Sequence, residues 1–453
     1  MSPKPSHRFL ISGWYGNENL GDEAQLCAIL HLIRGAFPQS EITVVSDNPK
    51  ATTAAHGVKA LGRKGLPSLL RYLKALRTSD LFILGGGELL YDVGPGGNPV
   101  TWLKEILWSK LAGTRAVYFN GGVGLIYNPV SKVWMRQVCN ALDGITVRDH
   151  LSKNHLESLG VKKPVQVTAD SVLALARSPM VSAAPDPRDG GNPVPQVGVN
   201  LRPWLYKKKQ IPAQSLKVCA RYTGSESDFS NFRKSLAGAL DFLKASGMGI
   251  TFFPICFSDK QMDENDPALS HEIAQLLKDG FDVQFMEGAP SLPEMMKIMR
   301  TFDFVIAMRL HALVFAALLK KPMIALSYDP KVNAFMERIG QSEFTLNIDE
   351  VSSEVLVKKI NHLLADRENI SKVLEAKGSE LAARAESSIS WIIELTNKKV
   401  KRSKIVAEGW ALVLKLLPQL LLYSLQRAFA VAHRLAQVPW AIRVALVLGK
   451  LKR

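Results

Sequence analysis

Short apolar runs alternate with helix-like stretches along the first part of the chain. Residues 9–12 form an apolar run, which is followed by a turn rich in glycine and asparagine and then, at residues 23–34, by apolar positions at helical spacing. The same order recurs after the apolar runs at residues 81–84, 115–119 and 144–147. Repeated strand–turn–helix units of this kind predict a parallel β-sheet with helices on both faces.

A second series of such units follows a break in the pattern. Residues 178–196 are rich in proline, glycine, aspartate and alanine and show no apolar periodicity, which is typical of a connection between domains. Five further strands are predicted beyond this break, at residues 197–201, 250–253, 283–285, 304–307 and 323–326. Ligands of open parallel sheets bind beyond the carboxyl ends of the strands, so we expect the chemistry in the loops that follow these strands.

The chain length of 453 residues suits two domains of about 150–200 residues each and an appendage. We predict an N-terminal α/β domain (residues 1–177), a linker (178–196), a C-terminal α/β domain (197–397) and a basic tail (398–453). Hydrophobic residues make up 47% of the chain and charged residues 22%, as is usual for folded proteins.

The spacing of the cysteines and the N-terminal residues indicate in which cellular compartment the protein is expected. The four cysteines, Cys27, Cys139, Cys219 and Cys256, lie far apart, which fits neither a disulfide framework nor a cysteine-based zinc site. The apolar run that follows Arg8 is too short for the central segment of a signal peptide. We therefore expect reduced thiols and a cytoplasmic location.

Most of the positive charge lies in the tail. The chain has a net charge of +16, and from Lys398 onward 12 lysine and arginine residues face a single acidic residue, Glu408, so the tail carries 11 of these charges. From Ile405 the sequence is strongly apolar, and at about 100° per residue its polar side chains fall within an arc of roughly 120°. This pattern is typical of a helix that lies in a membrane interface, with basic residues for acidic headgroups.

Other interpretations of the tail stay open or are disfavoured. The same helix could instead pack on the second domain or on another subunit. A membrane-spanning helix is not expected, because Lys415, Pro418 and Gln419 interrupt the run of about 20 apolar residues that spanning requires. Nucleic acid is not expected either, because the apolar face is too continuous for a basic strip that follows a phosphate backbone.

Two glycine-bearing turns follow predicted strands of the N-terminal half. In the first, Asn19, Asp22 and Glu23 stand at the start of a helix, where they suit hydrogen bonds to sugar hydroxyls, although Asp22 could simply cap the helix. In the second, Gly86 and Gly87 let the backbone approach a ligand closely, or they merely form a tight turn.

Cationic side chains follow three predicted strands of the C-terminal half. Arg202 comes at the end of the strand at residues 197–201, where a guanidinium suits forked binding of phosphate or carboxylate. Arg309 and His311 begin an otherwise apolar helix, an expensive position for a cation and an imidazole unless they are used. Lys331 follows the next strand, so we expect it at the same edge of the sheet.

Together these segments resemble the polysaccharide pyruvyl transferase family over roughly residues 8 to 340. The segments that carry the resemblance are Gly16 to Glu23, Gly85 to Gly87, Val147 to Asp149, Ala169–Asp170 and Arg309 to Ala317. The resemblance implies two Rossmann-like domains in the arrangement of GT-B glycosyltransferases, with phosphoenolpyruvate held mainly by the C-terminal domain and the acceptor on the N-terminal side.

On this reading, pyruvate moves from phosphoenolpyruvate to a sugar as a cyclic ketal, and phosphate is released. Arg202, Arg309 and Lys331 are predicted to bind the donor, and His311, with Arg309, to do the catalytic work as a proton shuttle near neutral pH. Asn19, Asp22, Glu23, Gly86 and Gly87 are predicted to bind the acceptor, a surface saccharide or its lipid-linked precursor. No metal and no cofactor besides this co-substrate are expected. The tail would hold the enzyme on the inner face of the plasma membrane.

Two competing functions remain at this stage. A GT-B glycosyltransferase would use the same cations for the diphosphate of a nucleotide sugar. A non-catalytic membrane-surface binding protein would be built around the tail, but it leaves the placement of Arg309 and His311 unexplained.

Overall fold

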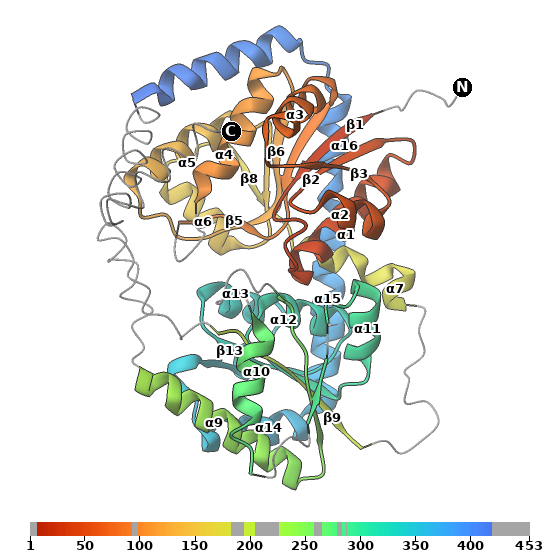
Figure 1. The fold of residues 1–453 in the computed structure, drawn as a ribbon, viewed down its shortest axis with the longest axis vertical. Coiled ribbons are helices and arrows are strands. Elements are labelled where there is room, and N and C mark those ends of the chain that lie inside the picture. The colour runs from red at the N-terminus through yellow and green to blue at the C-terminus, as the bar shows by residue number, and fades with distance from the viewer. Residues whose placement is uncertain are drawn as a thin grey trace, which may run out of the picture.

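The computed structural model describes residues 7–92, 98–182, 194–203, 226–257, 265–278, 283–286 and 288–418. It contains two parallel sheets, each with helices around it (Figure 1). The predicted α/β class is therefore confirmed. We call the part built on the first sheet the first unit and the part built on the second sheet the second unit.

The first sheet has the strand order β3-β2-β1-β4-β6-β7-β8, and β5 pairs with β6. Its strands are β1 (Arg8–Ser12), β2 (Glu41–Ser46), β3 (Lys59–Gly62), β4 (Leu81–Gly85), β5 (Glu88–Leu90), β6 (Arg115–Val123), β7 (Gly144–Val147) and β8 (Val165–Val167). Its helical segments are α1 (Leu20–Ala36), α2 (Pro49–His56), α3 (Leu66–Thr78), α4 (Pro99–Leu111), α5 (Pro129–Ala141), α6 (His150–Ser158), η1 (Ser171–Arg177) and α7 (Pro179–Ser182). The central strand β1 pairs on both sides, with Phe9 opposite Ile42 and Leu81.

The second sheet has the order β11-β10-β9-β12-β13-β14. Its strands are β9 (Gln196–Asn200), β10 (Gly249–Phe252), β11 (Gln284–Phe285), β12 (Phe304–Ala307), β13 (Met323–Ser327) and β14 (Thr345–Asn347). The helices are α9 (Glu226–Ala245), α10 (Asp266–Ala274), α11 (Leu292–Arg300), α12 (Leu310–Leu318), α13 (Pro330–Arg338), α14 (Ser353–Ala365) and α15 (Arg367–Ser387), with short turns at Ser342–Phe344 and Ile348–Glu350. The helix that follows them, α16 (Ile389–Asn397), lies against the first unit. In both sheets the chain order reverses beside the first strand, and ligands of such folds bind at that position.

The two units meet at the start of α1. The backbone N–H of Leu20 donates to the carbonyl of Ile255 at 2.9 Å, and the N–H of Phe257 donates to the carbonyl of Glu18 at 3.0 Å. One continuous cluster of buried side chains includes Phe9 and Ile29 of the first unit together with Phe315 of the second. The interface is therefore part of the apolar core.

After the second unit the chain returns to the first. The side chain of Asn120 in β6 donates to the hydroxyl of Ser388 at 2.8 Å, and Arg115 donates to the carbonyl of Leu395. Residues 402–418 form a further helix, drawn in blue across the far end of the first unit in Figure 1, and its Leu412 and Leu416 join the core beside α4.

The predicted domain boundaries stay predictions, and the structure adds that the chain from Ser388 onward lies against the first unit. Residues 183–193 of the predicted linker and residues 419–453 of the tail lie outside the described residues. Among the helices that the structure describes, none combines the length and apolar character needed to cross a membrane.

Lys110 of α4 ties the helix of residues 402–418 to the first unit. Its side chain is 1% exposed, and its ammonium lies 2.7 Å from Asp143 and 3.4 Å from Glu408. Breaking a buried ion pair leaves a charge without compensation. We expect Lys110→Ala to lower the free energy of unfolding in urea by about 3 kcal/mol. Lys59→Ala removes an exposed ion pair with Glu41 and should lower the free energy of unfolding by less than about 1 kcal/mol. Equal decreases for the two variants would contradict a stabilising role for the Lys110 pair.

Candidate active site

Three neighbouring strands of the second sheet deliver the predicted cations to one edge. Arg202 follows β9, Arg309 caps α12 directly after β12, and Lys331 lies in the first turn of α13 after β13. Since these strands are adjacent and parallel, their carboxyl ends lie side by side. His311 stands in the first turn of α12, on the same edge.

Tyr328 lies between two of these cations. Its hydroxyl accepts a hydrogen bond from Nη1 of Arg202 at 2.9 Å, and the guanidinium carbon of Arg202 lies 5.1 Å from the ring centroid. The ammonium of Lys331 lies 6.0 Å from the same centroid. Arg202 and Lys331 thus share one aromatic ring, an arrangement that holds two cations near a single position.

Lys331 reaches across to the first unit. Its ammonium lies 2.8 Å from Oε2 of Glu88, at the start of β5, and 3.8 Å from Asp329. Burial by itself would lower the pKa of Lys331, but the carboxylates of Asp329 and Glu88 outweigh it and raise this pKa above the ordinary value. Burial likewise opposes the charge of Glu88, yet Lys331 and Arg148 bring the pKa of this carboxyl below its usual range. Both groups are therefore charged at neutral pH.

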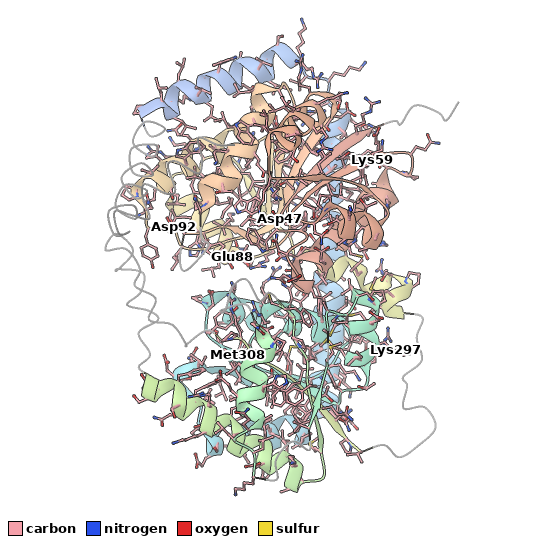
Figure 2. The ribbon with its side chains drawn as sticks, viewed as in Figure 1. Asp47, Lys59, Glu88, Asp92, Lys297 and Met308 are labelled. Atoms are coloured by element: carbon pink, nitrogen blue, oxygen red, sulfur yellow. The ribbon has the colours of Figure 1, made fainter. Side chains whose placement is uncertain are left out.

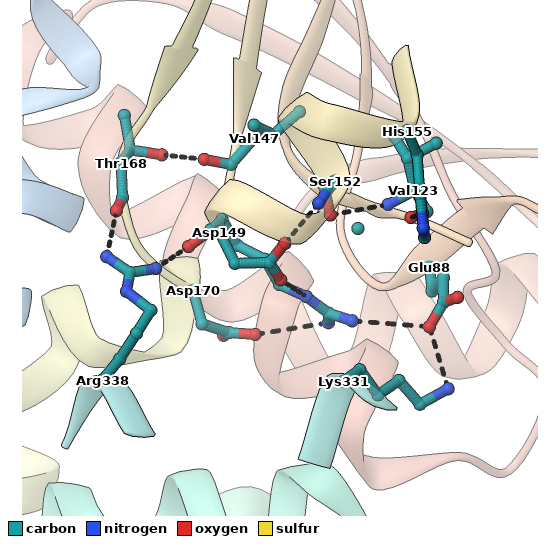
Figure 3. Close-up of polar contacts among 12 residues, drawn as sticks. Glu88, Val123, Val147, Asp149, Ser152, His155, Thr168, Asp170, Lys331 and Arg338 are labelled. Atoms are coloured by element: carbon teal, nitrogen blue, oxygen red, sulfur yellow. Dashed lines mark hydrogen bonds and ion pairs between the residues drawn. The ribbon is translucent and has the colours of Figure 1, made fainter. Parts of the chain in front are cut away.

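Glu88 also belongs to a cluster around Arg148 in the first unit. Figure 3 shows the carboxylates of this cluster, Glu88, Asp149 and Asp170, together with Lys331. The guanidinium of Arg148 lies 3.5 Å from Glu88, 3.4 Å from Asp149 and 3.6 Å from Asp170. Burial opposes its charge, but these carboxylates raise its pKa further above an already high value. Figure 2 shows Glu88 at the edge of the first unit that faces the second. The cluster is a buried charge network that extends through Lys331 into the second unit.

His311 faces α1 and Asp170. Its Nε2 atom lies 3.2 Å from the amide nitrogen of Gln25, which also donates to Oδ1 of Asp170 at 2.6 Å. Because an amide nitrogen can only donate, Nε2 accepts and the ring proton is assigned to Nδ1. A Cβ atom on Gly21 would lie 2.3 Å from Nδ1, so the ring leaves room only for glycine at that position of α1.

The environment keeps the His311 ring neutral. Burial lowers its pKa, and the cations of Arg148, Lys331 and Arg309 lower it further, against the opposing effect of Asp170. The result is a pKa of about 4, well below the usual value for histidine. Near neutral pH the ring is therefore a neutral imidazole that can accept a proton at Nε2, whereas we had predicted a group that titrates near neutrality.

Arg309 is paired within the second unit. Its Nη2 and Nε atoms donate to Oδ1 of Asp266 at 2.6 Å and 3.0 Å, and its backbone N–H donates to the side chain of Asn200 at 3.0 Å. Asp266 also accepts from the backbone N–H groups of Ile255 and Cys256. The carboxylate keeps the pKa of Arg309 raised despite burial. Arg309 thereby fixes the segment on which the start of α1 rests.

The predicted acceptor residues surround the start of α1. Asn19 caps this helix through a bond from the N–H of Gly21 at 3.0 Å. Both carboxylate oxygens of Glu23 are engaged, one by the N–H of Gly16 at 2.7 Å and the other by His56 at 2.8 Å. Glu23 therefore holds the turn through both of its carboxylate oxygens.

The glycine turn after β4 packs on the same helix. Gly86 and Gly87 have φ angles of 82° and 66°, in the left-handed region. A Cβ atom on Gly87 would lie 2.4 Å from Oδ1 of Asp22. Both positions thus favour glycine because of their backbone conformation. At Gly87 a side chain is also excluded because the turn lies against Asp22 of α1.

Several residues of this site were not singled out from the sequence. They are Gln25, Glu88, Arg148, Asp170, Asp266, Tyr328 and Arg338. Arg148 and Asp170 lie in segments that carry the family resemblance, so a signal existed for them. Glu88 directly follows the glycine turn, and Tyr328 follows the predicted strand at residues 323–326. Nothing in the sequence pattern pointed to Gln25 or Asp266.

A small pocket lies where the units face each other. Arg338, at the end of α13, closes one side of it by donating to the carbonyls of Thr168, at 2.7 Å, and Arg148. The pocket is lined by Arg148, Asp149, Ala169, Asp170, Leu173, Leu310, Lys331, Phe335, Arg338 and Leu381. Within the described part of the chain, no group of three or more histidine, cysteine or carboxylate side chains is placed to hold a metal ion.

Solved structures share the fold at low sequence identity. A glycosyltransferase from Rickettsia africae is 12% identical with a TM-score of 0.54, covering 87% of this chain and 99% of its own. A UDP-GlcNAc 2-epimerase from Methanocaldococcus jannaschii is 11% identical with a TM-score of 0.51, covering 78% and 91%. A ugt transferase from Siraitia grosvenorii, solved with UDP, is 13% identical with a TM-score of 0.50, covering 86% and 100%.

Sequence comparison gives the family. No curated protein matches this sequence. The family model described as polysaccharide pyruvyl transferase matches residues 19–330, a range that starts at the cap of α1 and ends at the first residue of α13. This range includes Gln25, Glu88, Arg148, Asp170 and His311. The chain belongs to the polysaccharide pyruvyl transferase family.

Proposed function

We propose that this protein transfers pyruvate from phosphoenolpyruvate to a sugar of a surface polysaccharide, or of its lipid-linked precursor, as a cyclic ketal. The observation that carries the proposal is the convergence of Arg202 and Lys331 on Tyr328, with His311 on the same edge of the second sheet. Membership of the family supports the reaction class.

The charges of the donor match this edge. Phosphoenolpyruvate carries a phosphate and a carboxylate, and both are bound well by cations in a site from which water is largely excluded. In the proposed complex Arg202 and Lys331 contact these groups, and Lys331 exchanges its carboxylate partner Glu88 for the donor. Arg309 acts as a positioning residue through Asp266 rather than as a donor ligand, which revises our prediction.

The reaction balances in atoms and protons. The methylene carbon of the enol takes a proton and becomes a methyl group, and the C2 atom, now electrophilic, is attacked by one sugar hydroxyl. A second hydroxyl displaces the phosphate from C2 and closes the ketal. The two hydroxyl protons replace those taken up by the methylene carbon and by the departing phosphate. The scheme draws its charge stabilisation from protein cations and needs no further cofactor.

His311 serves as the base in this scheme. Its neutral ring can accept the proton of an attacking hydroxyl at Nε2, the nitrogen that Gln25 orients. The carboxylate of Asp170, 3.8 Å from Nε2, stabilises the positive charge that forms. A bound anionic donor raises the pKa of His311 as well, which makes proton transfer to the ring more favourable.

The acceptor side belongs to the first unit. The turn of Gly86 and Gly87 packs beside Asp22 and leads into Glu88, the partner of Lys331, and we propose that the sugar lies against this turn. Asn19 and Glu23 would act indirectly, by holding the start of α1. We further propose a cytoplasmic enzyme that works at the inner face of the plasma membrane.

A second candidate is a glycosyltransferase that uses a nucleotide sugar. It is favoured by the shared fold, because one of the similar structures was solved with UDP. Arg202 and Lys331 could bind a diphosphate equally well. Thermal-shift measurements with phosphoenolpyruvate, UDP-sugars and GDP-sugars separate the two, since a ligand that binds the folded state raises the melting temperature.

The central test is the reaction itself. Incubation with phosphoenolpyruvate and a panel of lipid-linked saccharides should release phosphate and add one pyruvate ketal to one acceptor, as seen by mass spectrometry. Stabilisation by a nucleotide sugar together with no response to phosphoenolpyruvate would replace this proposal with the second candidate.

Donor affinity should depend on Lys331. Lys331→Met keeps a long side chain but removes the charge. We expect the dissociation constant for phosphoenolpyruvate, measured by calorimetry, to rise about tenfold or more, which is a loss of at least about 1.4 kcal/mol of binding free energy. Lys320→Met removes an exposed lysine of the same unit that pairs with Glu375 and should leave affinity unchanged. An unchanged constant for Lys331→Met would remove this residue from the donor site.

Turnover should depend on His311. We expect His311→Asn to lower kcat about a hundredfold or more, with donor affinity retained, because only proton transfer is lost. His362→Asn, at an exposed position of α14, is the control and should match the wild-type protein. A wild-type kcat for His311→Asn would exclude the role of base.

The pH profile gives a separate check. A base must be unprotonated, and the low pKa keeps His311 unprotonated above about pH 4. The value of kcat/KM, which reports the free enzyme, should therefore be limited by this group only as pH falls towards about 4. The contrary result would be a fall of kcat/KM below about pH 6.5 that is present in the wild type and absent in His311→Asn. It would show that the pKa of His311 is not lowered.

A further inference from the structure

Helix α3 leaves a stripe of leucines uncovered. Leu66, Leu69, Leu70 and Leu73 all have exposed side chains, with Leu66 68% and Leu70 60% exposed. At about 100° per residue the four fall within an arc of about 100°. Tyr72 and Leu76, on an adjacent face, are buried in the core of the first unit. The helix therefore packs through one face and presents a continuous apolar stripe on the next.

The stripe is flanked by basic side chains. Residues 63–79 contain five lysine and arginine residues and no aspartate or glutamate. Lys64, Arg71, Lys74 and Arg77 of this segment are exposed. Leucines beside positive charges are suited to contact with a membrane, which has an apolar interior and an anionic headgroup surface.

The helix of residues 402–418 continues this surface. Arg402, at its start, donates to the carbonyl of Arg77 in the last turn of α3. Leu412 and Leu416 of this helix are buried against the first unit, whereas Trp410, Leu414 and Leu417 are exposed, Leu414 by 70%. The two helices are thus in contact through Arg402, and each exposes large apolar side chains with basic residues nearby. Figure 1 shows the helix of residues 402–418, in blue, at the same end of the molecule as α3.

We propose that the exposed leucines of α3, with Trp410 and Leu414, form a docking surface for a membrane that contains anionic lipids. Exposed apolar patches on soluble proteins usually mark interaction sites. A second copy of the chain would bring the same basic residues face to face, which is unfavourable for charge, whereas an anionic bilayer attracts them. Each basic residue near such a surface adds to this attraction.

The start of α3 lies close to the turn that precedes α1. Arg63, three residues before Leu66, stacks on Trp102 with its guanidinium 4.9 Å from the ring centroid. It also donates to the carbonyl of Gly13, in the turn that leads to Asn19. The stripe therefore begins near the turn of residues 13–19, which leads into α1. If the proposed function holds, a lipid-linked acceptor would enter the site from the bilayer along this side.

The test is retention of the full-length protein on vesicles, which needs no catalysis. We compare vesicles of phosphatidylcholine and phosphatidylglycerol in equal amounts with vesicles of pure phosphatidylcholine, at low salt, by co-sedimentation. We expect Leu69→Gln/Leu70→Gln to weaken binding to the anionic vesicles about tenfold, because two apolar side chains no longer enter the interface. Lys64→Glu/Lys74→Glu should weaken it to a similar degree and should remove part of the salt dependence.

The matched control is Leu276→Gln/Leu364→Gln, which changes two leucines exposed on the second unit and should bind vesicles like the wild type. All variants should keep the wild-type melting temperature, and turnover with a water-soluble saccharide should be unaffected by the changes in α3. Wild-type retention of the Leu69/Leu70 variant would overturn the proposal. It would also be overturned if, without vesicles, the wild type sedimented as a dimer and this variant as a monomer, since the stripe would then be a contact between copies.

Discussion

The ion pair between Lys331 and Glu88 is the interaction on which the rest of the site depends. It joins the two units through groups that are both removed from most of the solvent, and such charges are stable only when they are compensated. Glu88 is held in turn by Arg148, which Asp149 and Asp170 balance. The geometry at the junction is therefore set by charge compensation as much as by apolar contact.

This network also explains the state of the catalytic candidate. His311 lies near three cations and one carboxylate, so its ring stays neutral although a carboxylate is close. An anionic donor would therefore enter a site that already carries an excess of positive charge. Such an anion would also lower the cost of a positive charge on the ring.

The sequence predicted the fold class and the location of the cations well, because both follow from local rules. Apolar runs at strand length followed by glycine turns indicated parallel sheets, and the rule that ligands bind beyond strand ends indicated Arg202, His311 and Lys331. The partners of these residues could not be predicted. Asp266 meets Arg309 only after the second sheet has formed, and Gln25 meets His311 only when α1 docks against the second unit.

For some residues the structure shows contacts that the sequence did not indicate. Glu23 has the chemistry of a sugar ligand, yet a backbone N–H and His56 occupy its two oxygens. Gly21 lies in the opening motif because the ring of His311 leaves no room for a side chain. Such distinctions depend on tertiary contacts, which no local pattern contains.

The return of the chain from Ser388 onward has a consequence for biosynthesis. Asn120, Arg115 and Lys110 of the first unit all have partners among the last residues described, so this unit cannot complete its contacts while it is being synthesised. The second unit emerges from the ribosome in the meantime and can fold around its own sheet. The first unit therefore lacks these contacts until residues 388–408 have been synthesised, and until then these positions are open to chaperones or to other chains.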